Sequence, residues 1–551
     1  MQKSYFGKIK MIYIDPPYNT GHEFIYPDKF SETLETYLEY TGQIDSSGRK
    51  FATNSDSSGR FHSNWINMIY PRLYLAKNLL RDDGVMFVSI GEHEIHNLRH
   101  VCNDIFGENN FLGCAARVSK KANNQGDFWS PNFDYILTYA KERESCKPFF
   151  GGVNYDAYDQ IETDGPRSGE KYQPVRLYMT SLDPMRGCTN QRYYIECPDG
   201  SLVIPPGNTF PAEKIHGAEV VPQSGADKVW RWSKKTFEQE RERILIKRVR
   251  SSNLVDQDGN PAQWNVFTKT YLKDVEDNAT AKPNSLIENH INQVSSHELS
   301  DLGVDFDFAK PSTLISYLIE IARVGEGDIV LDFFAGSGSS AHGVIRKNSE
   351  DGLNRKFILV QLPEPIDDQG EAGFKNIADI AKERVRRVFK SMQNKTLGEL
   401  DLLGASGKAD FGFRVFKLAK SNFKTWDGNA QLFDESGTQL DLHVDHIQPD
   451  GSSEDILYEL LLKAGFEPTT NARMISLAAR PVYSVHDGAM LICLERDITS
   501  ELIDSLADAN PLQVICLDEG FKGNDQLKAN AVQTFRARAQ AEESEIVFRT
   551  V

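Results

Sequence analysis

Four residues near the start of the chain, Asp15, Pro16, Pro17 and Tyr18, combine a carboxylate, two rigid prolines and an aromatic ring. They follow the apolar run Ile9–Ile14, which predicts a short buried strand because it is rich in isoleucine and stops at the prolines. Proline cannot donate a ladder hydrogen bond and biases the preceding residue towards an extended conformation. Asp15 is therefore expected at the carboxyl end of a strand, where open α/β sheets bind ligands, on a platform for hydrogen bonding and stacking.

A second apolar run, residues 329–334, also predicts a buried strand and ends in a turn of small residues. Gly336 and Gly338 lie in this turn, and Ser339 and Ser340 open the helix expected after it. Glycines let the backbone approach a ligand closely, and a helix amino terminus favours an anion. The third glycine of the dinucleotide fingerprint and the Lys-Ser/Thr of a P-loop are both missing, so neither of those sites is indicated.

Together the two stretches resemble the amino-methyltransferases that use S-adenosylmethionine. In that family a D-P-P-Y element, here residues 15–18, holds the target amino group, and an F-x-G-x-G element, here residues 334–338, holds the cofactor. The catalytic element comes first, which is similar to the circularly permuted β class. The extended match over residues 12–21, together with the far downstream residues 520–528, looks like the Mod subunit of Type III restriction–modification systems, and this resemblance covers nearly the whole chain.

The resemblance implies roles for individual residues. The implied catalytic residues are Asp15, Pro16, Pro17 and Tyr18. The implied cofactor-binding residues are Lys310, Pro311, Asp332, Phe334, Ala335, Gly336, Gly338 and Gln361. Lys310 and Pro311 look like the K-P element that flanks the cofactor in this class, although proline is also common in the first turn of any helix. Gln361 stands where many such enzymes place an acid for the ribose hydroxyls, and Glu364 is an alternative.

The residue types at the first element suit methyl transfer to adenine N6. This nitrogen is a poor nucleophile because its lone pair is delocalised into the ring. The Asp15 carboxylate and the Pro16 carbonyl can each accept a hydrogen bond from the amino group, which localises the lone pair and aims it at the methyl group. Tyr18 can stack on a base extruded from the duplex. Cytosine N4 stays an alternative target, but relatives acting there more often begin the motif with Ser.

The chain of 551 residues is too long for one core, and its pattern predicts a Rossmann-like α/β methyltransferase sheet, doubly wound and circularly permuted. We expect a catalytic half at 1–144, a target-recognition domain at 145–300, a cofactor-binding half at 301–400 and a small α/β domain at 410–551. Strands are expected at 111–118, 133–140 and 413–418, among others. Residues 28–62 are polar and predict a loop.

Basic residues in two regions are candidates for contact with DNA. The first region is the polar loop between the strands expected at 111–118 and 133–140, and the second is a basic run in the predicted target-recognition domain. These candidates are Lys120, Lys121, Lys234, Lys235, Lys247, Arg248 and Arg250. Cations on phosphates would supply affinity, while amide and guanidinium groups in the groove would read bases. An ordinary solvated surface with mixed charge has the same composition.

Charge and composition point to a cytoplasmic protein with protein partners as well as double-stranded DNA. The net charge is −17, and the residues from 401 onward include 24 acidic and 14 basic ones, so this end suits a protein partner better than phosphates. In the family this region serves dimerisation and the Res helicase–nuclease, so a homodimer and Res are implied partners. No apolar run is long enough to cross a bilayer. The seven cysteines form no Cys-x-x-Cys pair, and we expect no metal.

Two alternatives from other classes stay open. Type III Mod subunits usually carry a longer region before the catalytic strand, so this chain could be an N-terminally truncated, catalytically weak subunit for DNA recognition or assembly. Methylation of a protein or an RNA is the other alternative. Protein glutamine methyltransferases usually have Asn before Pro-Pro-Tyr, and the long insertion favours DNA.

Overall fold

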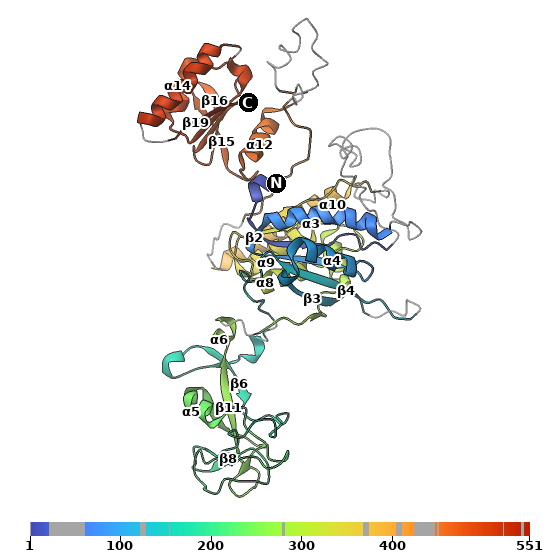
Figure 1. Cartoon of the computed structure of the whole chain (residues 1–551), viewed down its shortest axis with the longest axis vertical. Helices are drawn as coiled ribbons and strands as arrows, with labels where there is room; N and C mark the ends of the chain where they lie inside the picture. The colour runs from blue at the N-terminus through green and yellow to red at the C-terminus, as the bar shows by residue number, and fades with distance from the viewer. Residues whose placement is uncertain are drawn as a thin grey trace. The chain divides into compact units, whose positions relative to one another are not determined.

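The computed structural model of the chain is shown in Figure 1. It describes residues 2–20, 61–121, 128–151, 153, 155–277, 281–366, 374–403, 410–423, 447–448, 451–521, 523–541 and 545–551. The loop predicted at 28–62 lies outside these residues except for its last two, which open a helix. The described chain divides into two compact units, one of residues 148–284 and 320–323 and one of the remainder. The four domain boundaries expected from the sequence stay predictions.

The larger unit contains a seven-stranded sheet of order β12-β3-β4-β2-β1-β13-β14. Its strands are β1 (Ile9–Ile14), β2 (Leu80–Ile90), β3 (Phe111–Val118), β4 (Phe133–Ala140), β12 (Leu286–Ile287), β13 (Ile329–Asp332) and β14 (Lys356–Leu359). Strands β2, β1, β13 and β14 run parallel, whereas β4 is antiparallel to both β2 and β3. The two motif strands β1 and β13 are direct neighbours, with Ile12 paired to Leu331. Residues far apart in sequence are thereby brought to one edge of the sheet.

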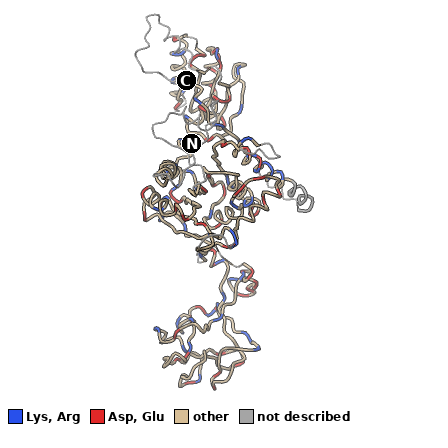
Figure 2. Tube along the Cα trace, turned by 90° about the vertical axis from the view of Figure 1, so that its right-hand side faces the viewer, with Lys and Arg blue, Asp and Glu red and all other residues tan. Residues whose placement is uncertain are grey.

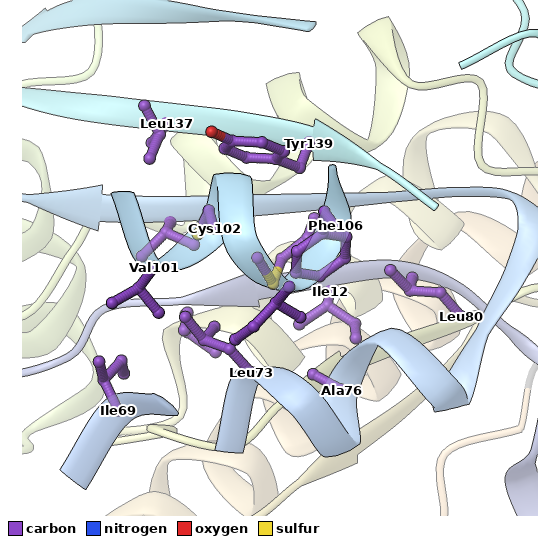
Figure 3. Packing of buried hydrophobic residues seen from close by; sticks show 14 of the residues in the cluster. Ile12, Ile69, Leu73, Ala76, Leu80, Val101, Cys102, Phe106, Leu137 and Tyr139 are labelled. Carbon is purple, nitrogen blue, oxygen red and sulfur yellow. The ribbon is translucent and has the colours of Figure 1, made fainter. Parts of the chain in front are cut away.

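Helices lie between and beside these strands along the chain. They are α1 (Gln2–Tyr5), α3 (Phe61–Leu79), α4 (Ile95–Phe106), η1 (Glu108–Asn110), α7 (Asn292–Leu302), α8 (Ser312–Ile321), α9 (Ser339–Asp351) and α10 (Ile377–Leu403). Among them, α4 and α9 contact the sheet. Figure 3 shows Leu73 of α3 and Phe106 of α4 packing with Ile12 of β1 and Tyr139 of β4. This mixed α/β sheet with packed helices agrees with the predicted fold class, while the circular permutation stays a prediction.

The smaller unit is built mainly of short antiparallel strands. One sheet has the order β5 (Gln160–Ile161), β6 (Lys171–Arg176), β11 (Trp264–Tyr271), β9 (Ile244–Arg248), and the other β10 (Val255–Asp256), β8 (Leu202–Ile204), β7 (Ile195–Glu196). Its helical turns are η2 (Tyr155–Ala157), η3 (Gly165–Arg167), α5 (Lys234–Gln239), η4 (Arg241–Arg243) and α6 (Leu272–Asp277). Trp230 is fully buried in its core, and the indole N–H donates to the Tyr193 carbonyl over 2.8 Å. A buried core shows that this insertion is itself a folded unit.

The last part of the chain forms a five-stranded sheet of order β15-β16-β17-β18-β19. Its elements are α12 (Ser453–Ala464), β15 (Ala472–Leu477), β16 (Arg480–Val485), β17 (Met490–Cys493), α13 (Ser500–Asp508), β18 (Gln513–Cys516), η6 (Asp518–Phe521), α14 (Asp525–Ala541) and β19 (Val547–Thr550). The strand predicted at 413–418 is wrong, because these residues form no ladder. Phe411 and Phe413 instead pack against Phe389 of α10.

Figure 2 shows basic (blue) and acidic (red) positions scattered among each other along the described trace. Within the described residues, no helix is both long enough and apolar enough to cross a membrane. The same residues hold no group of three or more His, Cys, Asp or Glu side chains arranged to bind a metal ion.

Candidate active site at the carboxyl edge of the sheet

The sheet order brings four charged side chains to one edge. Asp15 directly follows β1, and Asp332 ends the neighbouring strand β13. Because β4 is antiparallel to β2 and β3, its first residues and the last residues of β3 reach the same edge, which places Arg117 opposite Asp134 in the β3–β4 register. The two motifs predicted from the sequence therefore lie at the carboxyl edge of neighbouring strands, which is where open α/β sheets usually bind ligands.

Lys310 is bonded to Asp15. Its ammonium nitrogen lies 2.8 Å from both carboxylate oxygens of Asp15 and 3.8 Å from Oδ2 of Asp134. It also lies 4.8 Å from the centre of the Tyr18 ring, close enough for a cation–π contact. Lys310 is 8% exposed, so this ammonium is nearly removed from water. The structure thus joins a residue expected to flank the cofactor to the carboxylate expected to bind the target.

A buried ion pair supports Tyr18. The Arg117 guanidinium donates to both oxygens of Asp134, with Nε to Oδ1 at 2.8 Å and Nη2 to Oδ2 at 2.6 Å. The Tyr18 hydroxyl donates to the same Asp134 carboxylate over 3.2 Å. Arg117 is bonded further to the His290 carbonyl and to Asn292 Oδ1, at 2.7 and 3.0 Å. These contacts fix the Tyr18 ring at its hydroxyl end.

Burial and neighbouring charges fix the protonation states of Tyr18 and Arg117. Burial, followed by the charges of Asp15 and Asp134, raises the pKa of Tyr18 well above its ordinary value, so the phenol stays protonated and can donate. Burial lowers the pKa of Arg117, but the hydrogen bonds and charge of Asp134 outweigh this, and the pKa ends above its usual range. Breaking such a buried pair would leave an uncompensated charge, which typically costs about 3–5 kcal/mol.

A second buried carboxylate, Glu94, holds the turn that follows Tyr18. Glu94 accepts from the side-chain amide of Asn19 at 2.5 Å and from that of Asn97 at 2.7 Å, and its Oε1 lies 2.6 Å from His62 Nδ1. Asn19 has a left-handed backbone with φ of 59°, a conformation that asparagine tolerates better than most residues. The Trp65 indole N–H donates to the Pro17 carbonyl over 2.8 Å. The turn is therefore fixed from both sides.

The glycine turn after β13 has the shape of a ligand cradle. Gly336 and Gly338 have φ of 51° and 81°, which only glycine adopts readily. A Cβ on Gly338 would lie 3.3 Å from the Ala381 carbonyl oxygen, a tight contact, and would sit on a left-handed backbone that other residues rarely adopt. The Gly336 N–H donates to Gln361 Oε1 over 2.7 Å. Gln361 therefore fixes the turn from inside the protein in this structure.

Asp332 is a buried carboxylate next to that turn. It accepts from the Ser340 hydroxyl at 2.5 Å and from the Phe334 N–H at 2.9 Å. Burial is the main cause that raises its pKa from 3.8 to about 7, and the two hydrogen bonds oppose this rise. A carboxylate held this far from water suits a ligand carrying a positive charge. Pro311 and Ala335 are buried, and Phe334 is half-buried against Phe333.

The candidate DNA contacts lie in two places. Lys120 and Lys121 follow the end of β3, on the same edge as Asp134. The other candidates belong to the smaller unit, with Lys234 and Lys235 opening α5 and Lys247, Arg248 and Arg250 in or just after β9. Of these, Lys121, Lys235, Lys247, Arg248 and Arg250 have exposed side chains. Their contact with DNA stays a prediction.

Arg117, Asp134 and Glu94 are functional candidates that the sequence motifs do not include. A usable signal existed for the first two, because they are opposite charges one residue from the ends of two neighbouring apolar strands. A charged side chain in a predicted buried strand is rarely buried without an opposite charge, and a hairpin brings the end of its first strand next to the start of its second strand. Glu94 carried no comparable signal, because its partners come from three separate segments.

Comparison with known proteins identifies the family. The DNA methylase family model of the N6/N4 type matches residues 9–364. The EcoP15I Mod subunit of a Type III restriction–modification enzyme from Escherichia coli is 30% identical, over 100% of this chain and 83% of that protein. The EcoPI Mod subunit from Escherichia phage P1 is 31% identical over 71% of this chain, which spans 60% of that relative's length.

Among solved structures, the cytosine-N4-specific PvuII DNA methyltransferase matches 70% of this chain and 88% of its own, at 9% identity and a TM-score of 0.29. That score is too low for details of the PvuII enzyme to be carried over. The family model covers well over half of the chain, and the EcoP15I match covers all of it. The chain therefore belongs to the N6/N4 family of DNA methylases, as an S-adenosylmethionine-dependent DNA methyltransferase related to the Mod subunits of Type III restriction–modification enzymes.

Proposed function

We propose that this protein methylates adenine N6 at specific sites in duplex DNA, as the modification subunit of a restriction–modification system. The single observation that carries this proposal is the position of Asp15. Its carboxylate lies at the carboxyl edge of the sheet, beside the Tyr18 ring and one strand from the glycine turn. A base placed on Tyr18 would present its amino group to that carboxylate, on the side where the cofactor elements converge.

The residues of this chain would activate the amino group by accepting its protons. Asp15 takes one hydrogen bond and the Pro16 carbonyl takes the other, which localises the N6 lone pair. In the described part of the chain nothing donates to the Pro16 carbonyl, whereas Trp65 occupies that of Pro17. Forming the N–CH₃ bond leaves N6 with one proton too many, and Asp15 is the nearest base to receive it. Holding the reacting atoms in line supplies much of the rate.

The elements near the glycine turn fit S-adenosylmethionine, which supplies an electrophilic methyl group on a positively charged sulfur. Asp332 offers a buried negative charge at the end of β13. Gly336 has no side chain and is only partly buried, so a ligand could approach its backbone closely, while Gly338 lets the turn pack against Ala381. Gln361 and Glu364 lie after β14, where the nucleoside hydroxyls would bind in the resemblance set out above. We assign Lys310 and Pro311 to the wall between this cradle and Asp15.

Access to N6 requires the target base to leave the helix, because the reacting atom is otherwise inside the duplex. Tyr18 provides the surface on which the extruded base stacks. Lys120 and Lys121, which follow β3 at this edge, would bind phosphates near the site, and the exposed aromatic residues Phe128 and Trp129 lie in the same β3–β4 connection. Phosphate contacts would set register, and the cations of the smaller unit would add contacts for site recognition.

Two substitutions of Tyr18 distinguish the stacking of its ring on the base from the hydrogen bond of its hydroxyl to Asp134. Tyr18→Ala removes the ring, so we expect kcat/KM for DNA to fall roughly 5- to 150-fold, the equivalent of about 1–3 kcal/mol of base stacking. Tyr18→Phe keeps the ring and loses only the hydrogen bond to Asp134. We expect it to stay within about fivefold of the wild-type value, the weaker end of what one hydrogen bond contributes. Equal losses in the two variants, measured by steady-state methylation, would show that the ring does not stack on the base.

Adenine is favoured over cytosine N4 by the acidic first residue of the turn, since relatives acting on cytosine more often begin it with Ser. As partners we propose double-stranded DNA, a second copy of this chain and a Res helicase–nuclease subunit. The acidic final region, with 24 acidic and 14 basic residues, suits the protein partners. We place the protein in the cytoplasm, where DNA and the methyl donor are found.

The proposal is tested by incubating the protein with unmethylated genomic DNA and S-adenosylmethionine carrying a tritiated methyl group. We expect label to accumulate in the DNA until a fixed fraction of sites is filled. DNA already treated with unlabelled cofactor should then accept little further label. Label that stays out of DNA, in a protein that binds the cofactor, would contradict the proposal and favour the recognition or assembly role.

A further inference from the structure

The ammonium group of Lys310 occupies the position that the target base requires. It contacts both Asp15 oxygens at 2.8 Å and faces the Tyr18 ring at 4.8 Å. These are the two partners that the proposed function gives to the adenine amino group and to the adenine ring. A base stacked on this face of the Tyr18 ring, with its amino group bonded to Asp15 from the same side, would overlap the ammonium, so the two occupants exclude each other.

The Asp134 carboxylate is a second acceptor within reach of the Lys310 ammonium. Oδ2 of Asp134 lies 3.8 Å from the Lys310 nitrogen, so a small rotation of the lysine side chain exchanges one acceptor for the other. Asp134 is itself held by Arg117 and accepts from the Tyr18 hydroxyl. It therefore stays in place whether or not the lysine arrives. A buried ammonium that always keeps a carboxylate partner avoids the cost of an unpaired charge.

We propose that Lys310 is a displaceable stand-in for the target amino group. In the free protein it neutralises Asp15 and covers Tyr18, and on entry of the extruded base it moves to Asp134. This inference rests on the proposed function and gives Lys310 a positioning role in the same reaction. Once Lys310 has moved, Asp15 is free to accept from the amino group and then to take the proton that leaves N6.

The exchange also makes the pocket selective for bases with an amino group. An entering adenine replaces the N–H donors that Asp15 loses, so the carboxylate stays bonded throughout. A base that presents a carbonyl oxygen, such as thymine, would set an acceptor against an acceptor and leave a buried charge without a donor. Displacement of Lys310 is then unfavourable, and the base returns to the duplex.

The test compares Lys310→Met with the wild-type protein. Methionine nearly matches the length of the lysine stem and lacks the ammonium, and Lys310→Arg keeps a charge that cannot be lost. The DNA is a duplex with 2-aminopurine next to the target adenine, whose position is located beforehand by sequencing DNA that the wild-type protein has methylated. Fluorescence of 2-aminopurine reports extrusion, and calorimetry measures S-adenosylmethionine binding separately. Thermal melting checks that each variant folds, with Lys310→Gln used if the methionine variant does not.

With the stand-in removed, we expect the Met variant to extrude the base more readily, with an affinity for the duplex about tenfold higher, the effect of one hydrogen bond to a charged group. The Arg variant should extrude it less. An unchanged fluorescence signal together with weaker cofactor binding would overturn the inference and make Lys310 a cofactor residue. This failure differs from failure of the proposed function, in which the wild-type protein itself would not transfer methyl groups to DNA.

Discussion

Replacing Asp15 with alanine should lower the rate of methyl transfer to DNA by about 10³-fold or more, because the transferring nitrogen loses the group that localises its lone pair and receives its proton. Binding of S-adenosylmethionine should change only a few-fold, since Asp332 and the glycine turn are untouched. Single-turnover transfer of labelled methyl groups gives the rate, and calorimetry gives the affinity for the cofactor.

Two further variants make this result interpretable. Asp15→Asn keeps the shape of the side chain but removes the charge and offers an N–H towards the amino group, so it should be nearly as inactive. Asp82→Ala is a matched control in the same sheet, because that carboxylate is 66% exposed and forms an ion pair with Lys141 away from Asp15. Its activity should equal that of the wild type. Transfer by Asp15→Ala within tenfold of the wild-type rate would remove Asp15 from the mechanism.

The second large effect concerns stability. At pH 8, Asp332→Asn should raise the melting temperature of the cofactor-free protein. The folded pKa of Asp332 is about 7, raised by burial above the ordinary 3.8. A raised folded pKa means that the contribution of this group to stability is fully present below pH 4 and is lost as the pH rises through 7. If Asp332 has the ordinary pKa of 3.8 in the unfolded chain, its rise to about 7 on folding corresponds to a loss of roughly 4 kcal/mol in the free energy of unfolding at high pH.

Asparagine is neutral at every pH and nearly the same size as aspartate, so the Asp332→Asn variant avoids the loss of stability that ionisation of Asp332 causes as the pH rises. Its oxygen can still accept from the Phe334 N–H, and the Ser340 hydroxyl can turn to accept from its amide. We expect the wild type to lose stability relative to Asp332→Asn between pH 5 and pH 8, measured by thermal melts at both values. The same substitution should weaken binding of the positively charged cofactor. Parallel pH profiles for the two proteins would show that Asp332 does not titrate in this range.

Local sequence was sufficient where a strand is bounded by residues that cannot continue it. Strands β1, β3 and β4 have the bounds predicted, Ile9–Ile14, Phe111–Val118 and Phe133–Ala140. Strand β1 stops at two prolines, and the other two are separated by a polar loop. Strand β13 is shorter than predicted, because its backbone leaves the ladder at Asp332 to begin the glycine turn. The motif residues at these ends are the part of the site that could be predicted.

The contacts between segments could not be predicted in the same way. Lys310 and Asp15 are 295 positions apart, and they meet only because the sheet places β13 beside β1. Nothing local to Lys310 distinguishes a cofactor contact from a partner for the catalytic carboxylate. The strand predicted at 413–418 is wrong although its apolar residues fit a strand. Phe413 packs against Phe389 of α10, whereas Val415, Phe416 and Leu418 are about half exposed and pair with no neighbouring strand of the described chain.

The most direct test of the account is the identity of the methylated nucleoside. DNA incubated with the wild-type protein and S-adenosylmethionine is digested to nucleosides, which are separated and measured by mass spectrometry. The account predicts N6-methyldeoxyadenosine, present with the wild type and missing with Asp15→Ala. N4-methyldeoxycytidine in its place would contradict the assignment of adenine to the pocket formed by Asp15 and Tyr18.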